Sequence, residues 1–282
     1  MSTIVYDESA AQTGFKAFVK RNPLVSLYIT MFVLAWSVLI PQALYSQGLI
    51  SSPLPVFLEL LTGWAPGIAA VAVASIIAGR AGGRELLGRF LIWRVGAGWY
   101  IVAFFLLAGN ILGGIGLHVL FGGAMPVIPA AGAPIYSIAL SFVVLIILGV
   151  LINTEETAWR GFALPRLQAR YSVLVACVLL AIPEVLLHLP LFWVKENPFH
   201  QTVGLFWFSA FSVAAVFIYA FIFNSTKGSL VILTLLHASQ NAWANLLSDN
   251  SARPFYFTVA LTWMIALALI FLTKGQLGYE AE

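Results

Sequence analysis

Long apolar runs separated by short polar segments make up most of the chain from residue 23 onward. Each run is close to the ~20 residues that an α-helix needs to cross about 30 Å of hydrocarbon. The pattern therefore predicts about eight membrane-spanning helices, the fifth of which is short and contains Pro183. The predicted spans are residues 23–44, 55–78, 96–121, 134–153, 173–189, 203–223, 229–247 and 255–273.

Composition indicates the same fold class. Of the 282 residues, 61% are hydrophobic and only 9% are charged, and the mean hydropathy is +0.96. Soluble domains have about 25% charged residues. Because a soluble fold of this size could not bury so much apolar surface, the lipid bilayer must be the solvent for most of it. We expect an all-α, polytopic membrane helix bundle that forms a single transmembrane domain over residues 1–282.

The distribution of basic residues predicts the orientation of this bundle. The segments between successive spans lie alternately on the two sides of the membrane. Twelve of the fourteen basic residues fall in segments on one side, and only Lys195 and Arg253 fall in segments on the other. The positive-inside rule makes the basic side cytoplasmic, and an even number of spans then places both termini there. The twelve residues are Lys16, Lys20, Arg21, Arg80, Arg84, Arg89, Arg94, Arg160, Arg166, Arg170, Lys227 and Lys274.

Three further expectations follow from these features. The first apolar run is long enough to span and has no small-residue cleavage site after it, so it reads as a retained helix rather than a removed signal peptide. The net charge of +3 reflects the flanking basic residues and does not indicate a nucleic-acid partner. The single cysteine, Cys177, excludes a disulfide within the chain. We expect a multi-pass protein of a bacterial inner membrane.

Three groups of ionisable or amide side chains lie in or next to these spans. A charged residue at the bilayer centre costs about 2.5–3.5 kcal/mol on insertion scales, so such residues are candidates for function. One group follows the fourth span, and the others lie within the fifth and the seventh. In chain order the groups contain Glu155, Glu156 and Arg160, then Glu184 and His188, then His237 and Asn241.

The spacing of the residues in each group determines which face of a helix their side chains share. Glu156 and Arg160 are four residues apart and can form an ion pair, while Glu155 points about 100° away. The other two groups also have a spacing of four, so three inward-facing helices would form one polar pocket. Simpler explanations remain for each group alone. Thr154 could cap a helix whose first turn carries acids, a lone histidine can pack in a core, and polar side chains hold membrane helices together.

Three other polar residues are expected to lie outside this pocket. His118 has no polar partner at helical spacing and is expected to pack near the end of the third span. His200 falls in a predicted outer loop and is expected to be solvated. Glu59 is expected at the membrane interface near the start of the second span.

The ordered groups resemble the CPBP family of CAAX prenyl endoproteases and bacteriocin-processing or bacteriocin-immunity proteins, also called the Abi family. The matching pattern is Glu-Glu-x-x-x-Arg, then a histidine in an apolar helix, then His-x-x-x-Asn in a later helix. The segments after Arg160 and before the third group are also similar to the family, so the resemblance covers about residues 135–250. One position departs from it, because Glu184 stands where the family usually has phenylalanine.

The resemblance implies an intramembrane endopeptidase that hydrolyses a peptide bond with an activated water. Within that mechanism we expect Glu155 to be the general base with His188 assisting, and Glu156 with Arg160 to be structural. His237 and Asn241 would stabilise the oxyanion. Buried carboxylates suit general-base chemistry, and paired N–H donors suit an oxyanion. We further expect Glu184 to accept a hydrogen bond from a ring nitrogen of His188 and so fix its tautomer.

Other chemistries and functions stay open at this stage. No cofactor is required, although two histidines and a glutamate could bind zinc with an open position. The expected partners are the lipid bilayer and a peptide or protein substrate that arrives from the cytoplasmic side. The alternatives are a non-catalytic bacteriocin-immunity or peptide-binding protein, and a transporter, since intramembrane acids and histidines also mark ion pathways. The sequence does not name the substrate or the oligomeric state.

Overall fold

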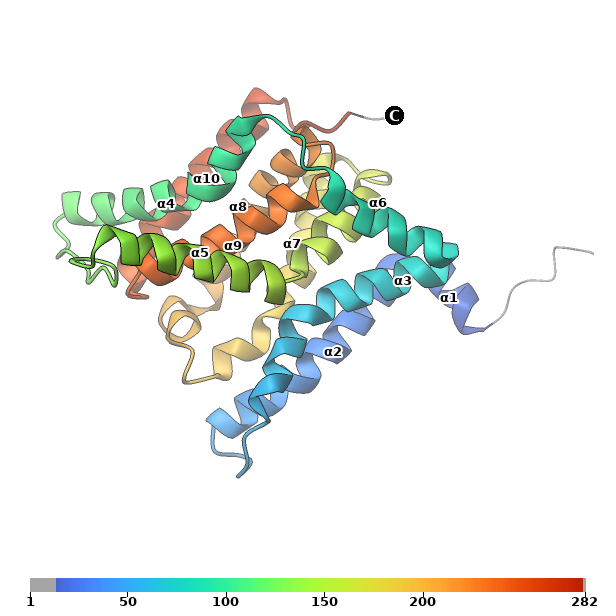
Figure 1. The fold of residues 1–282 in the computed structure, drawn as a ribbon, viewed down its shortest axis with the longest axis horizontal. Coiled ribbons are helices and arrows are strands. Elements are labelled where there is room, and N and C mark those ends of the chain that lie inside the picture. Colours follow the sequence, from blue (N-terminus) through green and yellow to red (C-terminus); the bar gives the residue numbers. More distant parts are fainter. Residues whose placement is uncertain (1–13, 281–282) are drawn as a thin grey trace, which may run out of the picture.

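The computed structural model describes residues 14–280, so the start of the N-terminal segment considered above, residues 1–13, lies outside the described residues. Within this range the chain forms ten α-helices, four short 3-10 or π-helical segments and no strand (Figure 1). The elements are α1 (Phe15–Arg21), α2 (Pro23–Ser46), η1 (Val56–Leu58), α3 (Glu59–Gly88), η2 (Arg89–Leu91), α4 (Ala97–Leu120), α5 (Ile135–Ile152), η3 (Thr157–Ala163), α6 (Leu164–Gln168), α7 (Val173–Leu187), η4 (Leu189–Trp193), α8 (Pro198–Ser225), α9 (Leu230–Leu247) and α10 (Ala252–Leu272).

Each of the eight predicted spans is a helix. The six helices that are long and apolar enough to cross a membrane are α2, α3, α4, α5, α8 and α10. The remaining two spans are α7, which has only 15 residues and continues through Pro183, and α9, whose apolar sequence is interrupted by the third polar group. The chain is therefore an integral, multi-pass membrane protein with an all-helical fold.

The helices pack as two parts that meet around η3. α2 packs along α3 on one side, while α4 packs against α9 and α10, and α5 against α9, on the other (Figure 1). α8 joins the parts because it contacts both α7 and α10. α2 and α3 thus form one wall, and η3, next to the first polar group, lies between α3 and the helices α7, α8 and α9.

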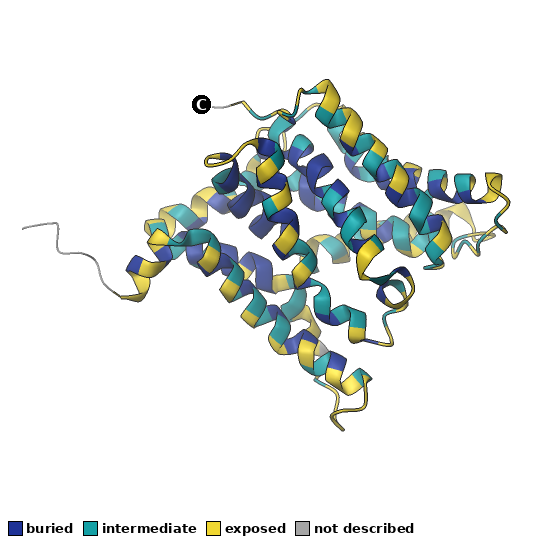
Figure 2. Cartoon of the chain, turned by 180° about the vertical axis from the view of Figure 1, so that it is seen from behind, coloured by how far each residue is buried: buried dark blue, intermediate teal, exposed yellow. Residues whose placement is uncertain are grey.

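Large apolar side chains cover the outer surface of the bundle. No residue of α5 is buried, and Ile135 is 79% exposed. Exposed and intermediate positions also run along the outer faces of the other long helices (Figure 2). Aliphatic surface of this extent is stable only against lipid, which agrees with the membrane assignment.

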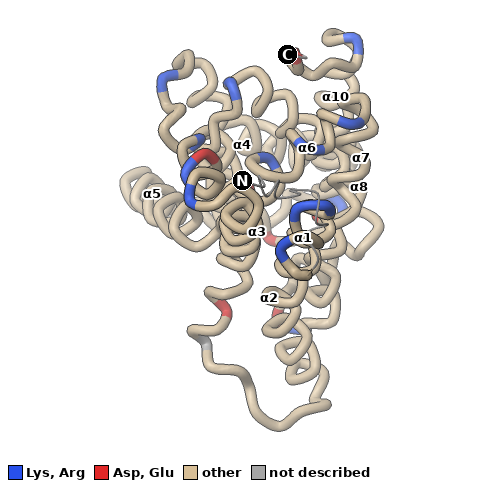
Figure 3. Tube along the Cα trace, turned by 90° about the vertical axis from the view of Figure 1, so that its right-hand side faces the viewer, with Lys and Arg blue, Asp and Glu red and all other residues tan. Residues whose placement is uncertain are grey.

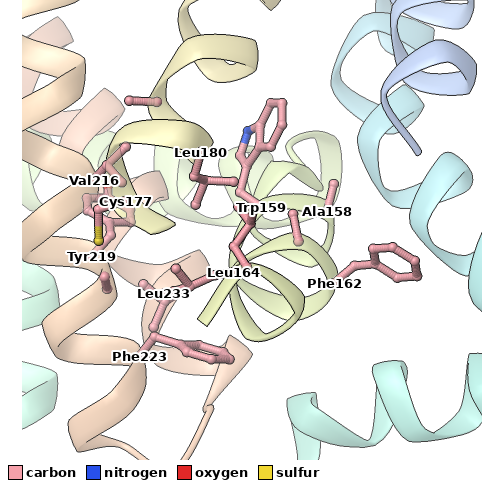
Figure 4. Packing of buried hydrophobic residues seen from close by; sticks show 14 of the residues in the cluster. Ala158, Trp159, Phe162, Leu164, Cys177, Leu180, Val216, Tyr219, Phe223 and Leu233 are labelled. Carbon is pink, nitrogen blue, oxygen red and sulfur yellow. The ribbon is translucent and has the colours of Figure 1, made fainter. Parts of the chain in front are cut away.

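The buried core is centred on η3. All seven residues of this segment are buried, and Trp159 and Phe162 are fully enclosed. The two aromatic rings leave η3 on different sides, and Leu180 of α7 lies next to Trp159 (Figure 4). This close-packed segment contains Arg160 and directly follows Glu155 and Glu156, so its packing fixes where the first polar group lies.

Basic residues gather at one end of the bundle. In Figure 3 they lie around α1, α6 and the C-terminal end, and the loop between α2 and α3 at the opposite end has none. α3 breaks at Gly79, where φ is +64°, and its continuation carries Arg80 and Arg84 at the basic end. One of the twelve residues assigned to this side was assigned wrongly. Arg160 is not in a loop but is 1% exposed inside the bundle.

Candidate active site

A cavity of about 860 Å³ lies among α4, α8, α9 and α10 and reaches the polar groups at its inner end. The structure brings five of the six predicted site residues to its wall. The sixth, Arg160, lies behind the wall and contacts two of the lining carboxylates. The five lining residues are Glu155, Glu156, His188, His237 and Asn241.

Thr154 positions the first polar group by inserting into α3. Its hydroxyl donates to the carbonyl of Gly63 at 2.8 Å and accepts from the backbone N–H of Gly67 at 2.9 Å. These are two groups that an undisturbed α-helix would pair with each other. Thr154 therefore does not cap the helix that follows it, and the capping explanation of this group is wrong. Instead it anchors the chain just before Glu155 to the opposite wall.

The close approach of Thr154 makes Gly67 sensitive to any side chain. A Cβ at position 67 would lie 2.6 Å from the Thr154 hydroxyl oxygen and 2.7 Å from its Cβ. We expect Gly67→Ala to lower the free energy of unfolding by about 1–3 kcal/mol, as overpacking in a filled interior does. Thermal unfolding of the purified protein in detergent measures the change.

Gly109 provides a matched control on α4. A Cβ at position 109 would meet no atom within 4 Å, so Gly109→Ala should leave the melting temperature unchanged or raise it slightly. Equal melting temperatures for the Gly67 and Gly109 variants would contradict the role given to the Thr154 contact.

The Glu155 carboxylate is held by two donors. Trp159 donates its indole N–H to Oε2 at 3.1 Å, and the side-chain amide of Asn153 donates to Oε1 at 3.2 Å. The backbone N–H of Glu155 in turn donates to Asn153 Oδ1 at 2.9 Å. Because each carboxylate oxygen can accept more than one hydrogen bond, Glu155 keeps lone pairs for a group in the cavity.

Glu156 links the first polar group to the third. Its Oε1 accepts from His237 Nδ1 at 2.9 Å and from Arg160 Nη1 at 3.3 Å. The predicted i,i+4 pair of Glu156 and Arg160 is thus present. The amide of Asn153 donates to His237 Nε2 at 3.2 Å, so both ring nitrogens of His237 are engaged.

Residues 157–163 are π-helical, whereas the sequence pattern suggested an ordinary α-helix. A π turn is rare and concentrates at functional sites. Here the π-helical segment directly follows the two acids, Glu155 and Glu156, and Trp159 within it donates back to Glu155.

Glu184 does not have the role expected from its spacing. Its carboxylate pairs with Arg160, with Oε2 3.0 Å from Nη1 and Oε1 3.4 Å from Nη2. The backbone carbonyl of Glu184, not its side chain, accepts from His188 Nδ1 at 2.9 Å. The tautomer of His188 is still fixed as expected, but by a main-chain group. The reason is that His188 follows the last residue of α7, where its ring turns back onto the carbonyl four residues earlier.

Arg160 is enclosed by these acids and by an aromatic ring. Its guanidinium carbon lies 4.6 Å from the centre of the Tyr219 ring, and the Tyr219 hydroxyl donates to Gln240 Oε1 at 3.0 Å. The Tyr219 ring also meets the His237 ring edge to face. Arg160 thereby connects η3, α7 and α8.

His200 was expected to be solvated in an outer loop, and this was wrong. It lies in the first turn of α8, is 8% exposed, lines the cavity and stacks near His188 with ring centres 6.2 Å apart. Its Nδ1 bonds to Asn197, the residue before the helix. The predicted span began at 203, next to the break in α8 at Gly204, where φ is +73°, and the short helical segment from Pro198 that precedes this break was not predicted.

Neither His118 nor Glu59 lines the cavity, as expected. His118 is buried near the end of α4, where its Nε2 bonds to the carbonyl of Ala124, away from the three groups. Glu59 begins α3 near the loop that follows α2 and bonds to Gln42.

Sequence reasoning missed several neighbours of the site. Asn153, Tyr219 and Gln240 all contact the predicted residues or line the cavity. Asn153 had a usable signal, since it is a polar residue at the end of an apolar run, next to the first group. Tyr219 had none, because a tyrosine in an apolar span is usual.

The side chains that could bind a metal ion can be compared with the arrangement that a metal site needs. Among residues 14–280, no group of three or more His, Cys, Asp or Glu side chains stands where it could hold a metal ion. A zinc site with two histidines and a glutamate would need these side chains to rearrange.

Loops at the outer end of the cavity form its mouth. Asp249 lines it, accepts from the backbone N–H of Val127 at 3.2 Å, and accepts from both the hydroxyl and the backbone N–H of Ser251. Slight burial opposes ionisation, but the hydrogen bonds from Ser251 and Val127 outweigh it and lower the pKa of Asp249. The mouth therefore carries a carboxylate that ties the α4–α5 loop to the α9–α10 loop.

Known proteins similar to this chain share the segment that contains the three groups. The family model described as type II CAAX prenyl endopeptidase Rce1-like matches residues 134–243. CAAX prenyl protease 2 of Methanococcus maripaludis is 30% identical in an alignment 180 residues long that covers 61% of this chain. The match spans 65% of the length of that relative. Together with the ordered motifs, these similarities support a relationship to the CPBP family of CAAX prenyl endoproteases and bacteriocin-processing (Abi) proteins over the segment that contains the three groups.

Proposed function

We propose that this protein is an intramembrane endopeptidase that hydrolyses a peptide bond with a water activated by Glu155 and His188. One observation carries the proposal. A carboxylate held by two donors and a histidine of fixed tautomer line the same cavity, next to a second histidine and an amide. This combination provides a base, a proton carrier and hydrogen-bond donors in one cavity.

The hydrogen bonds define the protonation state that the reaction would start from. His188 donates from Nδ1 to the Glu184 carbonyl, which leaves the Nε2 lone pair for the cavity. Glu155 takes a proton from the water while the water oxygen forms a bond to the substrate carbonyl carbon. The C–N bond then breaks, and the proton passes to the leaving nitrogen, with His188 as the carrier.

Stabilising the oxyanion requires donors on the same side of the cavity. Asn241 lies one turn after His237 on α9 and is exposed to the cavity. His237 can donate from Nε2 only when its ring carries both protons and the Asn153 amide has turned aside, because Nδ1 already serves Glu156. We propose that the Glu156 carboxylate stabilises this imidazolium, so that Glu156 acts on the reaction through His237.

The proposal is tested by proteolysis in the cells that produce the protein. Peptides that begin at newly formed N-termini in the membrane fraction should appear with the wild-type protein and disappear with His188→Ala. The same comparison can be made with purified protein and a peptide carrying a prenylated CAAX sequence, the substrate named for the relative from M. maripaludis. The rate should not fall when a metal chelator is added.

Other outcomes would favour other functions. Loss of the rate with chelator and recovery with zinc would favour the metal mechanism. A cellular phenotype that survives both His188→Ala and Glu155→Ala would favour a non-catalytic binding or immunity protein. Proton or ion flux in reconstituted vesicles would favour a transporter.

A further inference from the structure

Loops at one end of the bundle, and the parts of α4, α8, α9 and α10 that adjoin them, form most of the cavity wall, which extends along α8 as far as Tyr219. In the described part of the chain, no lining residue belongs to the basic connecting segments 80–95, 164–172, 225–229 or 273–280. The cavity therefore opens away from the basic end.

Hydrogen bonds hold the connecting loops of this end together. The backbone N–H of Ala130 donates to the carbonyl of Leu246 at 3.0 Å, which joins the α4–α5 loop to the end of α9. Ser46 at the end of α2 donates to Glu196 of the α7–α8 loop. Because Glu196 also lines the cavity, these loops form an ordered rim around the mouth.

The charge distribution assigns a side of the membrane to this rim. Lys195 and Arg253 are the basic residues at this end, whereas eleven others remain at the opposite end after Arg160 is removed from the count. An excess of this size in short connecting segments marks the cytoplasmic side. The mouth then faces away from the cytoplasm, and its position does not support the cytoplasmic access expected from the sequence.

We infer that the cavity receives its substrate from the non-cytoplasmic side of the membrane. The substrate class is then a polypeptide that has already crossed the membrane, or the external segment of a membrane protein. The side of the mouth follows from geometry and charge alone, whereas its use by a substrate rests on the proposed function.

The lining suits an extended polypeptide backbone. Between the rim and the inner end, α9 presents amide side chains at Gln240, Asn241 and Asn245, and Ser248 follows the helix. Each peptide group that leaves water needs partners for its N–H and its carbonyl. Amides provide both a donor and an acceptor, so this wall can pair with main chain independently of its sequence.

Cysteine labelling tests the side of the mouth. Cys177 is fully buried, so the unaltered protein serves as the blank. Glu196→Cys and Ser248→Cys place thiols at the rim, and Ala81→Cys places one on an exposed position between Arg80 and Arg84. Each variant is treated with a membrane-impermeant maleimide in right-side-out and in inverted vesicles.

The expected labelling is opposite for the two ends. Both rim variants should be labelled in right-side-out vesicles and protected in inverted ones, and Ala81→Cys should show the reverse. The reverse result at both ends would place the mouth in the cytoplasm and overturn the inference. Labelling of the rim variants only after detergent is added would overturn it too, because the mouth would then be closed to water.

A second measurement tests substrate entry. Attaching a bulky maleimide to Ser248→Cys from outside should lower the His188-dependent cleavage at least tenfold, while the same reagent from the other side on Ala81→Cys should not change it. Unchanged cleavage after complete modification of Ser248→Cys would overturn entry through the mouth. Absence of His188-dependent cleavage in the unmodified protein would instead refute the proposed function and leave the labelling result intact.

Discussion

Replacing Glu155 with glutamine is expected to lower the rate of peptide-bond cleavage by about 10²–10⁴-fold, the usual contribution of a general base. Glutamine keeps the size of the side chain but cannot take a proton from water. Its amide oxygen can still accept from Trp159 or Asn153, so the local fold should persist. The measurement is the rate of His188-dependent cleavage in proteoliposomes, together with the melting temperature of the variant.

Glu85 offers a matched control for this substitution. It is an exposed carboxylate on the continuation of α3 beyond Gly79, outside the cavity wall. Glu85→Gln makes the same chemical change and should leave the rate within about twofold. If Glu155→Gln kept the wild-type rate while Glu156→Gln abolished it, the roles of the two acids would have to be exchanged.

The fold could be predicted because span length and apolarity are local properties of the chain. All eight helices appear near their predicted positions. The differences arise where local rules do not decide. The second predicted span ends where α3 breaks at Gly79, yet the helix resumes and carries basic residues onward. The predicted sixth span starts next to the break in α8 at Gly204, and the short helical segment before that break was missed.

In the candidate site, the sequence predicted contacts between residues of the same helix but not contacts between different segments. The spacing of Glu156 and Arg160 gave their ion pair correctly. The pair of Arg160 with Glu184 joins η3 to α7, and the bond of Glu156 to His237 joins η3 to α9. Such contacts depend on how distant segments pack, and the π turn at 157–163 changes which side chains meet. No periodicity in the sequence encodes them.

The end of the bundle at which the cavity opens could not be predicted for the same reason, because it depends on contacts between distant segments. The first group follows the fourth span, so counting spans placed it at the cytoplasmic end. In the structure, Thr154 is attached to Gly63, near the start of α3, at the end of that helix remote from the basic residues. The helix before it, α5, therefore ends inside the bundle, and the catalytic candidates lie within it rather than at its basic surface.

Removing the charge of Arg160 is expected to destabilise the fold. Arg160→Met should lower the free energy of unfolding by about 3–5 kcal/mol, because it leaves Glu156 and Glu184 as buried acids without their cation. Glu184→Gln alone should cost less, since Arg160 keeps Glu156 and the Tyr219 ring. Thermal and denaturant unfolding in detergent measure each variant.

The double variant separates a charge effect from a packing effect. In Arg160→Met with Glu184→Gln, one of the two stranded acids is gone, so part of the loss should be recovered, with a coupling of about 1–3 kcal/mol. If the two losses simply added, Glu184 would not be paired with Arg160 in solution. In this chain the carboxylate of Glu184 gives Arg160 a second acid, 15% exposed beside the cavity, and so ties the helix that carries His188 to the segment that carries Glu155.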